Sequence, residues 1–243
     1  MDTIFINNSD VQSISRQKKT IYNMDNNIDS STTLTVISDF LSHHDYDKLH
    51  EIIVEFLIGG NSSGGNSSNT IDVNSKIKFA HSSIGWHPNY SPHWNFDLTD
   101  HDFFNVYMLS KIRSIEDWTQ NLLVKRIYCS VQTSQQHGNW HYDDDYLDSY
   151  TFTLYCNLNS TLKNSLSDNN YNIYSKYINQ ELTQNDENYG NFYIKYPNHP
   201  MKSIKTKNNN AVLFNSTIMH NGDCYSYDSN YTRCVIAYKL VQP

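Results

Sequence analysis

Apolar and polar positions follow a helical period in the first half of the chain and a two-residue period in the second half. A strand-like apolar run lies at 34–37. After it in the sequence, apolar side chains recur at three- and four-residue spacing at Leu49, Ile52, Ile53 and Phe56. This spacing predicts a helix with one apolar face, and Ser42 stands where it can cap the first turn. A short strand followed by a capped helix is therefore expected.

A second helix is expected from Asp102 to Leu123, which extends the helical support over about 33–123. Its apolar side consists of Phe103, Phe104, Val106, Tyr107, Leu109, Ile112 and Ile115. The aromatic, proline-containing stretch at 85–98 is expected to be a loop, either packed over the sheet or facing a substrate. Helices thus precede the strand-rich part of the chain.

From about residue 124 the period changes to two, which is typical of strands with two different faces. Apolar residues alternate through two runs at Ile127, Cys129, Val131, Phe152, Leu154, Cys156 and Leu158. The residues between them are mostly polar: Tyr128, Ser130, Gln132, Thr153, Tyr155 and Asn157. These polar faces meet either water or a wet pocket, because both lie close in sequence to residues 141–143.

Later strands are expected in the runs NFYIKY, AVLFNSTIM and TRCVIAYKL. Many short strands after two helices predict an α+β fold in which an antiparallel sandwich or barrel carries the helices on one sheet. The expected organisation is a flexible segment at 1–32 and a single domain at 33–243, with its β core over about 124–243. Two polar segments interrupt this domain: a Gly/Ser/Asn loop at 59–69 and an insertion at 160–188 with a short helix around 171–182.

Composition narrows the classes of function. The 25 acidic residues outnumber the 18 Lys and Arg residues, and a net charge of −7 argues against a nucleic-acid-binding surface. No apolar window reaches the length of a membrane span, and the polar N-terminus does not resemble a signal peptide. Cys129, Cys156, Cys224 and Cys234 form no CxxC pair, which favours buried thiols in a reducing compartment. An intracellular, cytoplasmic protein is therefore expected.

The stretch HYDDD offers the first candidate chemistry. In an extended segment residues i and i+2 point the same way, so His141 and Asp143 can reach one metal ion while Tyr142 points away. Two imidazoles and one carboxylate form the facial triad of non-haem Fe(II) oxygenases, and the third ligand need only lie on an adjacent strand. The pattern is short, and a polar loop containing a histidine is the alternative. Asp144 and Asp145 lack the i+2 spacing and are read as turn acids.

The second half of the candidate site lies between residues 209 and 240. An apolar strand ends at His220, a polar loop follows, and a new strand opens with Arg233. This last strand is apolar on both sides, with Val235 and Ala237 on the face of Arg233, so it is internal. An arginine at the mouth of an internal strand is expected to have a partner, whereas an isolated one would be a surface residue.

The order of HxD, a distant histidine and an arginine opening the next strand resembles the 2-oxoglutarate- and Fe(II)-dependent oxygenase superfamily, particularly its prolyl-hydroxylase-like branch. The resemblance covers about 126–240 and, more faintly, the stretch VISDFLSHHDYDKLHEII. It implies a double-stranded β-helix, also called a jelly roll. It also implies that His141, Asp143 and His220 bind iron, that Arg233 binds the distal carboxylate of 2-oxoglutarate, and that Tyr128 helps to hold this cosubstrate.

The resemblance also implies a reaction. Fe(II), 2-oxoglutarate and O₂ would be required, with ascorbate as a further candidate, and succinate and CO₂ would be released as the substrate is hydroxylated. The expected partner is a protein or peptide, with proline favoured, or a small molecule; a nucleic-acid substrate is a weaker option and no membrane is expected. The alternatives are a non-catalytic jelly-roll binding module and a cupin-type enzyme that uses another metal without 2-oxoglutarate.

Overall fold

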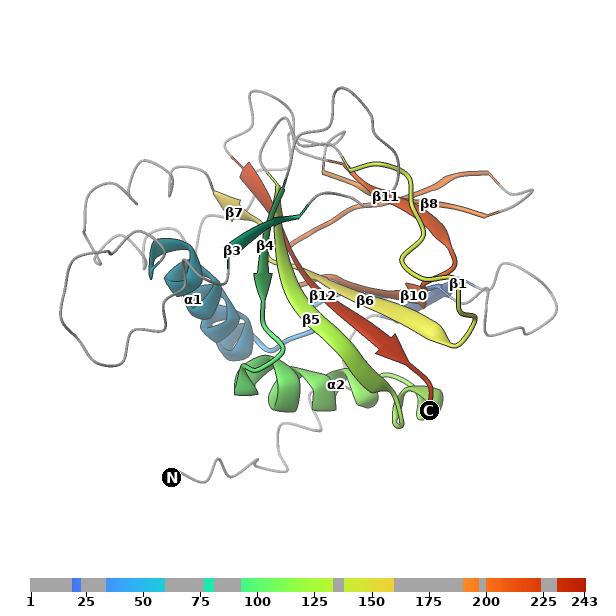
Figure 1. Cartoon of the computed structure of the whole chain (residues 1–243), viewed down its shortest axis with the longest axis horizontal. Coiled ribbons are helices and arrows are strands. Elements are labelled where there is room, and N and C mark those ends of the chain that lie inside the picture. The colour runs from blue at the N-terminus through green and yellow to red at the C-terminus, as the bar shows by residue number, and fades with distance from the viewer. Residues whose placement is uncertain are drawn as a thin grey trace.

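The computed structural model describes residues 19–22, 34–59, 77–80, 93–132, 138–159, 190–196, 200–223 and 231–243 (Figure 1). Most of the segment at 1–32, the loop after Gly59, residues 85–92 and the insertion at 160–188 with its short helix lie outside these ranges. The four described residues of the N-terminal segment, Lys19–Tyr22, form strand β1, which pairs with β2.

Two antiparallel sheets make up most of the fold. The larger, nine-stranded sheet has the order β1-β2-β10-β6-β12-β5-β4-β3, with β7 paired to β12. Its other strands are β2 (Leu34–Ile37), β3 (Ile77–Ala80), β4 (His93–Asp97), β5 (Leu123–Gln132), β6 (Ser149–Tyr155), β7 (Leu158–Asn159), β10 (Ala211–Asn215) and β12 (Tyr231–Val241). The smaller sheet has the order β11-β8-β9, formed by Met219–Gly222, Phe192–Lys195 and Lys202–Ile204.

The two sheets pack face to face through a buried apolar cluster. Its members come from both sheets: Leu34, Tyr155, Val212, Phe214 and Val235 from the larger sheet, and Phe192 and Ile194 from the smaller one. Removing this apolar surface from water is the main force that holds the sheets together. This sandwich of antiparallel strands is the architecture expected of a jelly roll.

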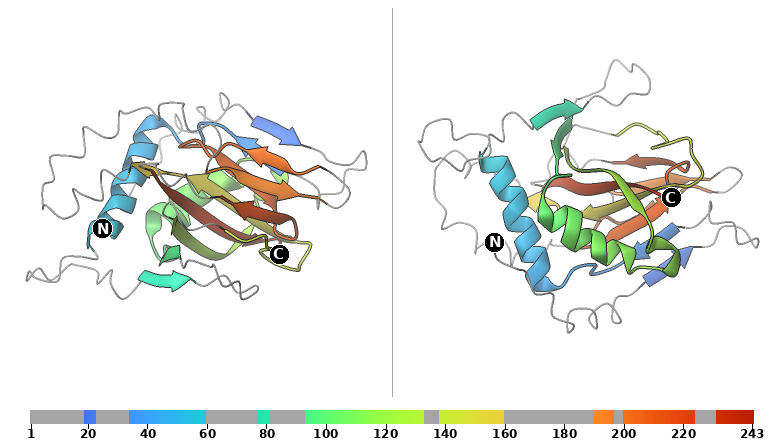
Figure 2. Two further views of the ribbon diagram at one scale, coloured as in Figure 1. Left: turned by 90° about the horizontal axis from the view of Figure 1, so that it is seen from above. Right: turned by 60° about the horizontal axis from the view of Figure 1, so that its bottom comes forward.

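The opposite face of the larger sheet carries the main hydrophobic core. Helix α1 (His43–Gly59) contributes Leu49, Ile53 and Val54, and the second helical region contributes Phe104, Met108 and Ile112. They share one buried cluster with the strand residues Ile127, Cys129, Phe152, Leu154, Ile236 and Tyr238. Figures 1 and 2 show both helices on this side of the sheet. The alternation along the strands therefore directs apolar side chains to the helices and the other set to the smaller sheet.

The start of α1 agrees with the sequence prediction. The backbone N–H of Asp45 donates to Ser42 Oγ at 3.2 Å, and this hydroxyl donates to the Asp45 carboxylate at 2.5 Å. Such a cap satisfies an N–H group that has no partner within the helix. None of the helices in the described ranges has the length and apolar character needed to cross a membrane.

The predicted helix from Asp102 to Leu123 is wrong in its extent. The region forms a π-helical segment η4 (Phe103–Met108), a short α2 (Leu109–Arg113) and a 3₁₀ turn η5 (Asp117–Thr119). Near the end of α2, Ser114 Oγ donates to the Lys111 carbonyl at 2.7 Å, a local bond that competes with a further helical turn. The Arg113 guanidinium binds the Leu122 carbonyl and fixes the turn into β5.

The predicted loop at 85–98 is also wrong over its last residues. His93–Asp97 forms β4, which pairs with β5 through Trp94 opposite Val131 and Phe96 opposite Cys129. Burial of Phe96 in the main core gives the strand its anchor. The strand was not predicted because the prolines and aromatic residues just before it are typical of a loop.

Candidate metal centre

The polar faces of the predicted strands form the wall on which the candidate site is built. Tyr155 lies opposite Val235 across β6 and β12, and Tyr128 lies opposite Ala237 across β5 and β12. Tyr155 and Val235 belong to the cluster shared with the smaller sheet. Tyr155, one of the residues predicted to face either water or a pocket, therefore faces the interior between the sheets.

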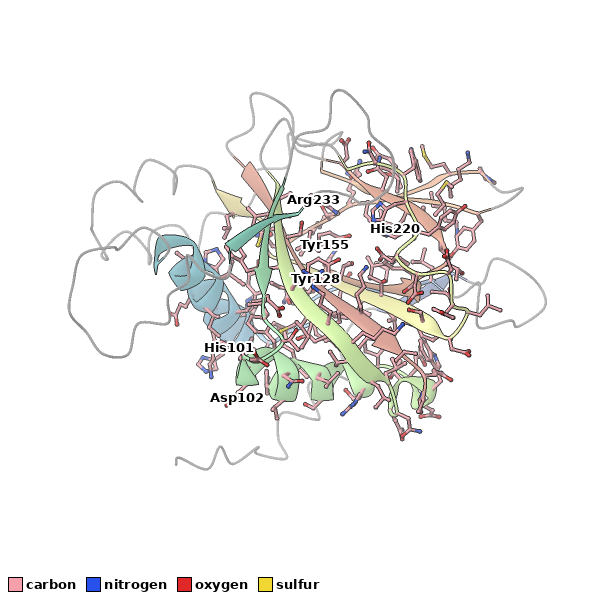
Figure 3. The ribbon with its side chains drawn as sticks, viewed as in Figure 1. His101, Asp102, Tyr128, Tyr155, His220 and Arg233 are labelled. Atoms are coloured by element: carbon pink, nitrogen blue, oxygen red, sulfur yellow. The ribbon has the colours of Figure 1, made fainter. Side chains whose placement is uncertain are left out.

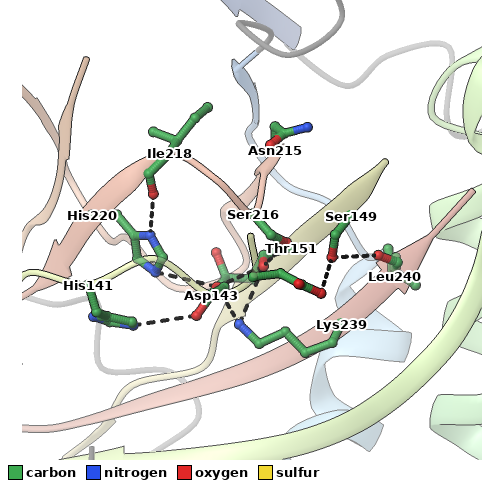
Figure 4. A network of polar contacts seen from close by, with 12 residues as sticks. His141, Asp143, Ser149, Thr151, Asn215, Ser216, Ile218, His220, Lys239 and Leu240 are labelled. Carbon is green, nitrogen blue, oxygen red and sulfur yellow. Dashed lines mark hydrogen bonds and ion pairs between the residues drawn. The ribbon is translucent and has the colours of Figure 1, made fainter. Parts of the chain in front are cut away.

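His141, Asp143 and His220 converge, as the sequence predicts. One ligand atom from each lies within 4.8 Å of the others. His141 Nε2 is 3.4 Å from Asp143 Oδ1, and His220 Nε2 is 3.4 Å from Asp143 Oδ2 (Figure 4). Two imidazoles and one carboxylate at these separations fit the donor set of a facial-triad iron site.

Backbone pairing brings these residues together. His141 and His220 form an isolated bridge in which each N–H donates to the other's carbonyl at 3.0 Å. The N–H of Asp143 donates to the Ser216 carbonyl at 2.9 Å. The segment carrying the HxD motif is therefore bound to the chain on either side of Ile218, at both ends of the turn that leads into β11.

Both histidines present the correct nitrogen to a metal. His141 Nδ1 lies 2.7 Å from the Asn139 carbonyl, and His220 Nδ1 lies 2.8 Å from the Ile218 carbonyl. Because a carbonyl oxygen only accepts, each Nδ1 carries the hydrogen and each Nε2 keeps a free lone pair. Burial lowers the pKa of His220, which keeps its imidazole in the neutral form that binds metal.

Asp143 is held as an anion. Burial opposes its ionisation, but His220 and the Lys239 ammonium outweigh burial and hold the pKa of Asp143 well below its ordinary value. Thr151 Oγ1 donates to Asp143 Oδ2 at 2.7 Å, and Lys239 forms an ion pair with the same oxygen. The carboxylate thus stays charged inside the protein.

Arg233 lies beside β11, the strand that carries His220. Its side chain is buried, and its guanidinium carbon is 5.6 Å from the centre of the Tyr155 ring (Figure 3). A Cβ on Gly222 would come within 2.1 Å of Arg233 Nη1, so only a glycine leaves room for the guanidinium. Gly222 follows His220 by two residues, or about 7 Å along a strand. The guanidinium therefore lies beside the strand that carries His220.

Tyr128 lies at the other end of this wall. The Lys239 Nζ atom is 5.8 Å and the Arg126 guanidinium carbon 4.7 Å from the centre of its ring. Its register partner is Ala237, four residues along β12 from Arg233. Tyr128 is thus closer to the Asp143–Lys239 pair in the ladder than to Arg233, and its contact with a cosubstrate remains a prediction.

The other expected wall residues divide into two groups. Tyr155 lies beside Arg233, whereas Asn157 binds the Thr206 carbonyl and accepts from the Cys234 N–H, which is a structural role. The side chain of Gln132 lies outside the described part of the structure. The three described cysteines, Cys129, Cys156 and Cys234, are free and buried, as predicted.

Sequence reasoning missed Lys239, Thr151 and Gly222. Two of them have a signal in the two-residue period: Lys239 continues the face of Arg233, Val235 and Ala237, and Thr151 precedes Thr153 and Tyr155 on the same face. Gly222 shares the inward face of His220. A lysine near the end of a strand ordinarily reads as a surface residue, so its role was not evident without the fold.

Comparisons with known proteins agree with this geometry at the level of fold. No protein-family model matches the chain, and no curated protein matches its sequence. Among solved structures, a prolyl-4-hydroxylase from Pseudomonas putida is similar with a TM-score of 0.51 and 9% identity, over 97% of this chain and 98% of that one.

Two further solved structures are similar at a TM-score of 0.54. One is a prolyl hydroxylase from Trichoplax adhaerens in complex with a hypoxia-inducible-factor peptide, 12% identical over 86% of this chain and 83% of that one. The other is the non-haem α-ketoglutarate-dependent epimerase SnoN of nogalamycin biosynthesis, 6% identical over 86% and 77%. The chain therefore has the fold of prolyl hydroxylases and other 2-oxoglutarate/Fe(II) oxygenases.

Proposed function

We propose that this chain is an Fe(II)- and 2-oxoglutarate-dependent dioxygenase that hydroxylates its substrate. The observation that carries the proposal is the convergence of His141, Asp143 and His220, whose ligand atoms lie within 4.8 Å of one another. The fold and the buried Arg233, whose guanidinium lies against Gly222 on the strand of His220, support it.

Each residue has a distinct part in this function. The two Nε2 atoms and the Asp143 carboxylate would hold the iron, and this set leaves coordination positions open on one side. Arg233 would bind the distal carboxylate of 2-oxoglutarate through two parallel hydrogen bonds, which fix both its charge and its direction. Iron bound with 2-oxoglutarate and O₂ would supply the oxidising chemistry. The chain itself orients these groups and keeps water out of the interior.

The proposed substrate is a protein or peptide. Four large apolar side chains are exposed on the segment that carries His141 and Asp143: Trp140, Tyr142, Tyr146 and Leu147, with Tyr146 70% exposed. Exposed aromatic residues grouped beside a reactive site favour contact with an extended partner over a small polar molecule. The similar Trichoplax protein was solved with a peptide bound. A prolyl residue is the position of hydroxylation that the sequence resemblance favours.

A screen of peptides and metabolites for succinate release tests this function. The protein with Fe(II), 2-oxoglutarate and O₂ should release succinate in the presence of a substrate, and that substrate should gain one oxygen by mass. Asp145→Asn is the matched control, because Asp145 is an exposed acid two residues from Asp143. Asp143→Ala should lose succinate release while Asp145→Asn keeps it.

The alternatives give different results in the same assay. A non-catalytic binding module would bind ligand without releasing succinate, and a cupin-type enzyme would act without any need for 2-oxoglutarate. Succinate release by Asp143→Ala at the wild-type rate would exclude the proposed site.

A further inference from the structure

Lys239 is a largely buried cation in contact with a residue of the candidate metal centre. Its side chain is 19% exposed, and its ammonium forms an ion pair with Asp143 Oδ2 and lies 3.3 Å from Thr151 Oγ1 (Figure 4). Within the described ranges, Asp143 is the carboxylate that pairs with this ammonium. A lysine is seldom buried without a specific partner, so its place beside a metal ligand calls for an explanation.

The contacts of Lys239 decide how Asp143 can bind. Oδ2 of Asp143 receives both the Thr151 hydroxyl hydrogen and the Lys239 ammonium. Oδ1 carries neither of these contacts and faces His141 Nε2 at 3.4 Å. A carboxylate with one oxygen engaged in this way favours binding a metal through the other oxygen alone, which leaves one more coordination position open than bidentate binding would.

The charge of Lys239 also affects the metal. The Lys239 ammonium contacts Asp143, the one anion among the triad residues, so its charge offsets the negative charge that this carboxylate offers to a metal. A divalent ion that binds alone adds two positive charges beside this ammonium, in an interior where charges are weakly screened. A dicarboxylate that binds with the metal brings two negative charges that balance those of the metal.

We propose that Lys239 is a positioning residue that makes tight metal binding depend on the dicarboxylate. Its ammonium opposes a divalent ion bound without 2-oxoglutarate more strongly than it helps to hold Asp143 in place, and the dianion relieves that opposition. This inference rests on the proposed function, because it takes the triad as the metal site. It does not require a known substrate.

A purely structural role for Lys239 predicts the opposite sign. If the ammonium only holds Asp143 in place, its loss frees the carboxylate to move and the metal binds more weakly. If the ammonium opposes the metal, its loss strengthens binding of the metal alone. The direction of the change in metal affinity thus separates the two roles.

The test measures the dissociation constant of Mn(II) with and without 2-oxoglutarate, since this metal binds oxygen and nitrogen donors without turnover. Lys239→Gln and Lys239→Met remove the charge, and Lys239→Arg keeps it. Lys125→Gln is the matched control: it removes the same charge from an exposed lysine, which pairs with Asp144 at 2.8 Å. Thermal unfolding identifies the variants that are folded.

For the neutral variants at Lys239 we expect Mn(II) alone to bind about tenfold more tightly than in the wild type, with a smaller gain on adding 2-oxoglutarate. Lys239→Arg and Lys125→Gln should behave like the wild type. Equal or weaker binding of Mn(II) by a folded neutral variant would overturn the role of Lys239 while leaving the proposed function in place. Failure of the wild type to bind Mn(II) even with 2-oxoglutarate would defeat both.

Discussion

His141 and His220 each donate their Nδ1 hydrogen to the carbonyl of the residue two positions before them, Asn139 and Ile218. This repeated local bond sets the tautomer and direction of both rings without any other side chain. The sequence could predict the three candidate ligands because the order of HxD, a later histidine and an arginine resembles that of the oxygenase superfamily. It could not predict which nitrogen faces the metal, because that depends on the backbone of the turns.

Asp143→Asn is expected to abolish tight metal binding. The amide replaces the only anionic ligand of the triad, so the loss should exceed the about ten- to hundredfold that removal of an outer partner costs. Calorimetric titration with Mn(II) measures this change. Asp145→Asn, the same substitution at an exposed neighbour, should leave the affinity unchanged, and an equal loss in both variants would contradict the assignment.

Thr151→Val is expected to weaken metal binding by about tenfold. The substitution keeps the shape of the side chain and removes the hydroxyl that donates to Asp143 Oδ2 at 2.7 Å. Thr35→Val is the control, because Thr35 is a buried strand residue whose hydroxyl has no hydrogen-bond partner in the structure. An affinity equal to that of the wild type in Thr151→Val would show that this hydroxyl does not orient the carboxylate.

At the scale of elements, β11 connects the metal centre to the arginine. His220 and Gly222 lie on one face of this strand, and the missing side chain at Gly222 admits the Arg233 guanidinium. The two-residue period of β12 predicted that Arg233 faces the interior. The close approach of two strands at a glycine has no signal in the sequence of either strand alone.

Gly222→Ala is therefore expected to raise the KM for 2-oxoglutarate. The added methyl group would lie within 2.5 Å of three guanidinium atoms and displace them from the pocket. Loss of a hydrogen bond to a charged group lowers the affinity for the cosubstrate by about ten- to a hundredfold. Arg233→Ala should have a similar effect, and both variants should still bind Mn(II). A normal KM in Gly222→Ala would contradict the assigned position of the distal carboxylate.

The segment that carries the HxD motif also has exposed aromatic side chains, which are proposed to contact the substrate. Tyr146→Ser should raise the KM for a peptide substrate and leave Mn(II) binding intact, since the Tyr146 side chain is 70% exposed and its ring lies beside Lys125. Val106→Ser is the control: Val106 is 58% exposed on η4, at the helical side of the larger sheet. An equal rise in KM for both variants would argue against a docking role for the segment.

At the scale of the whole molecule, the sandwich brings together residues that are far apart in the chain. Helices cover one face of the larger sheet, and the other face meets the smaller sheet, so its polar side chains lie in the interior (Figures 1 and 2). The alternation of apolar and polar positions predicted two different faces, but it left open whether the polar face meets water or a pocket. The end of the second helix and strand β4 were not predicted, because local hydrogen bonds at Ser114 and pairing with β5 decide them.

The proposed function requires that His141, Asp143 and His220 hold one iron ion that also binds 2-oxoglutarate. Anaerobic titration of the protein with Fe(II) and then with 2-oxoglutarate tests it most directly, by visible absorption. We expect a weak metal-to-ligand charge-transfer band that saturates at one metal per chain and is lost in Asp143→Ala. The absence of a band in the wild type, or a band of equal strength in Asp143→Ala, would contradict it.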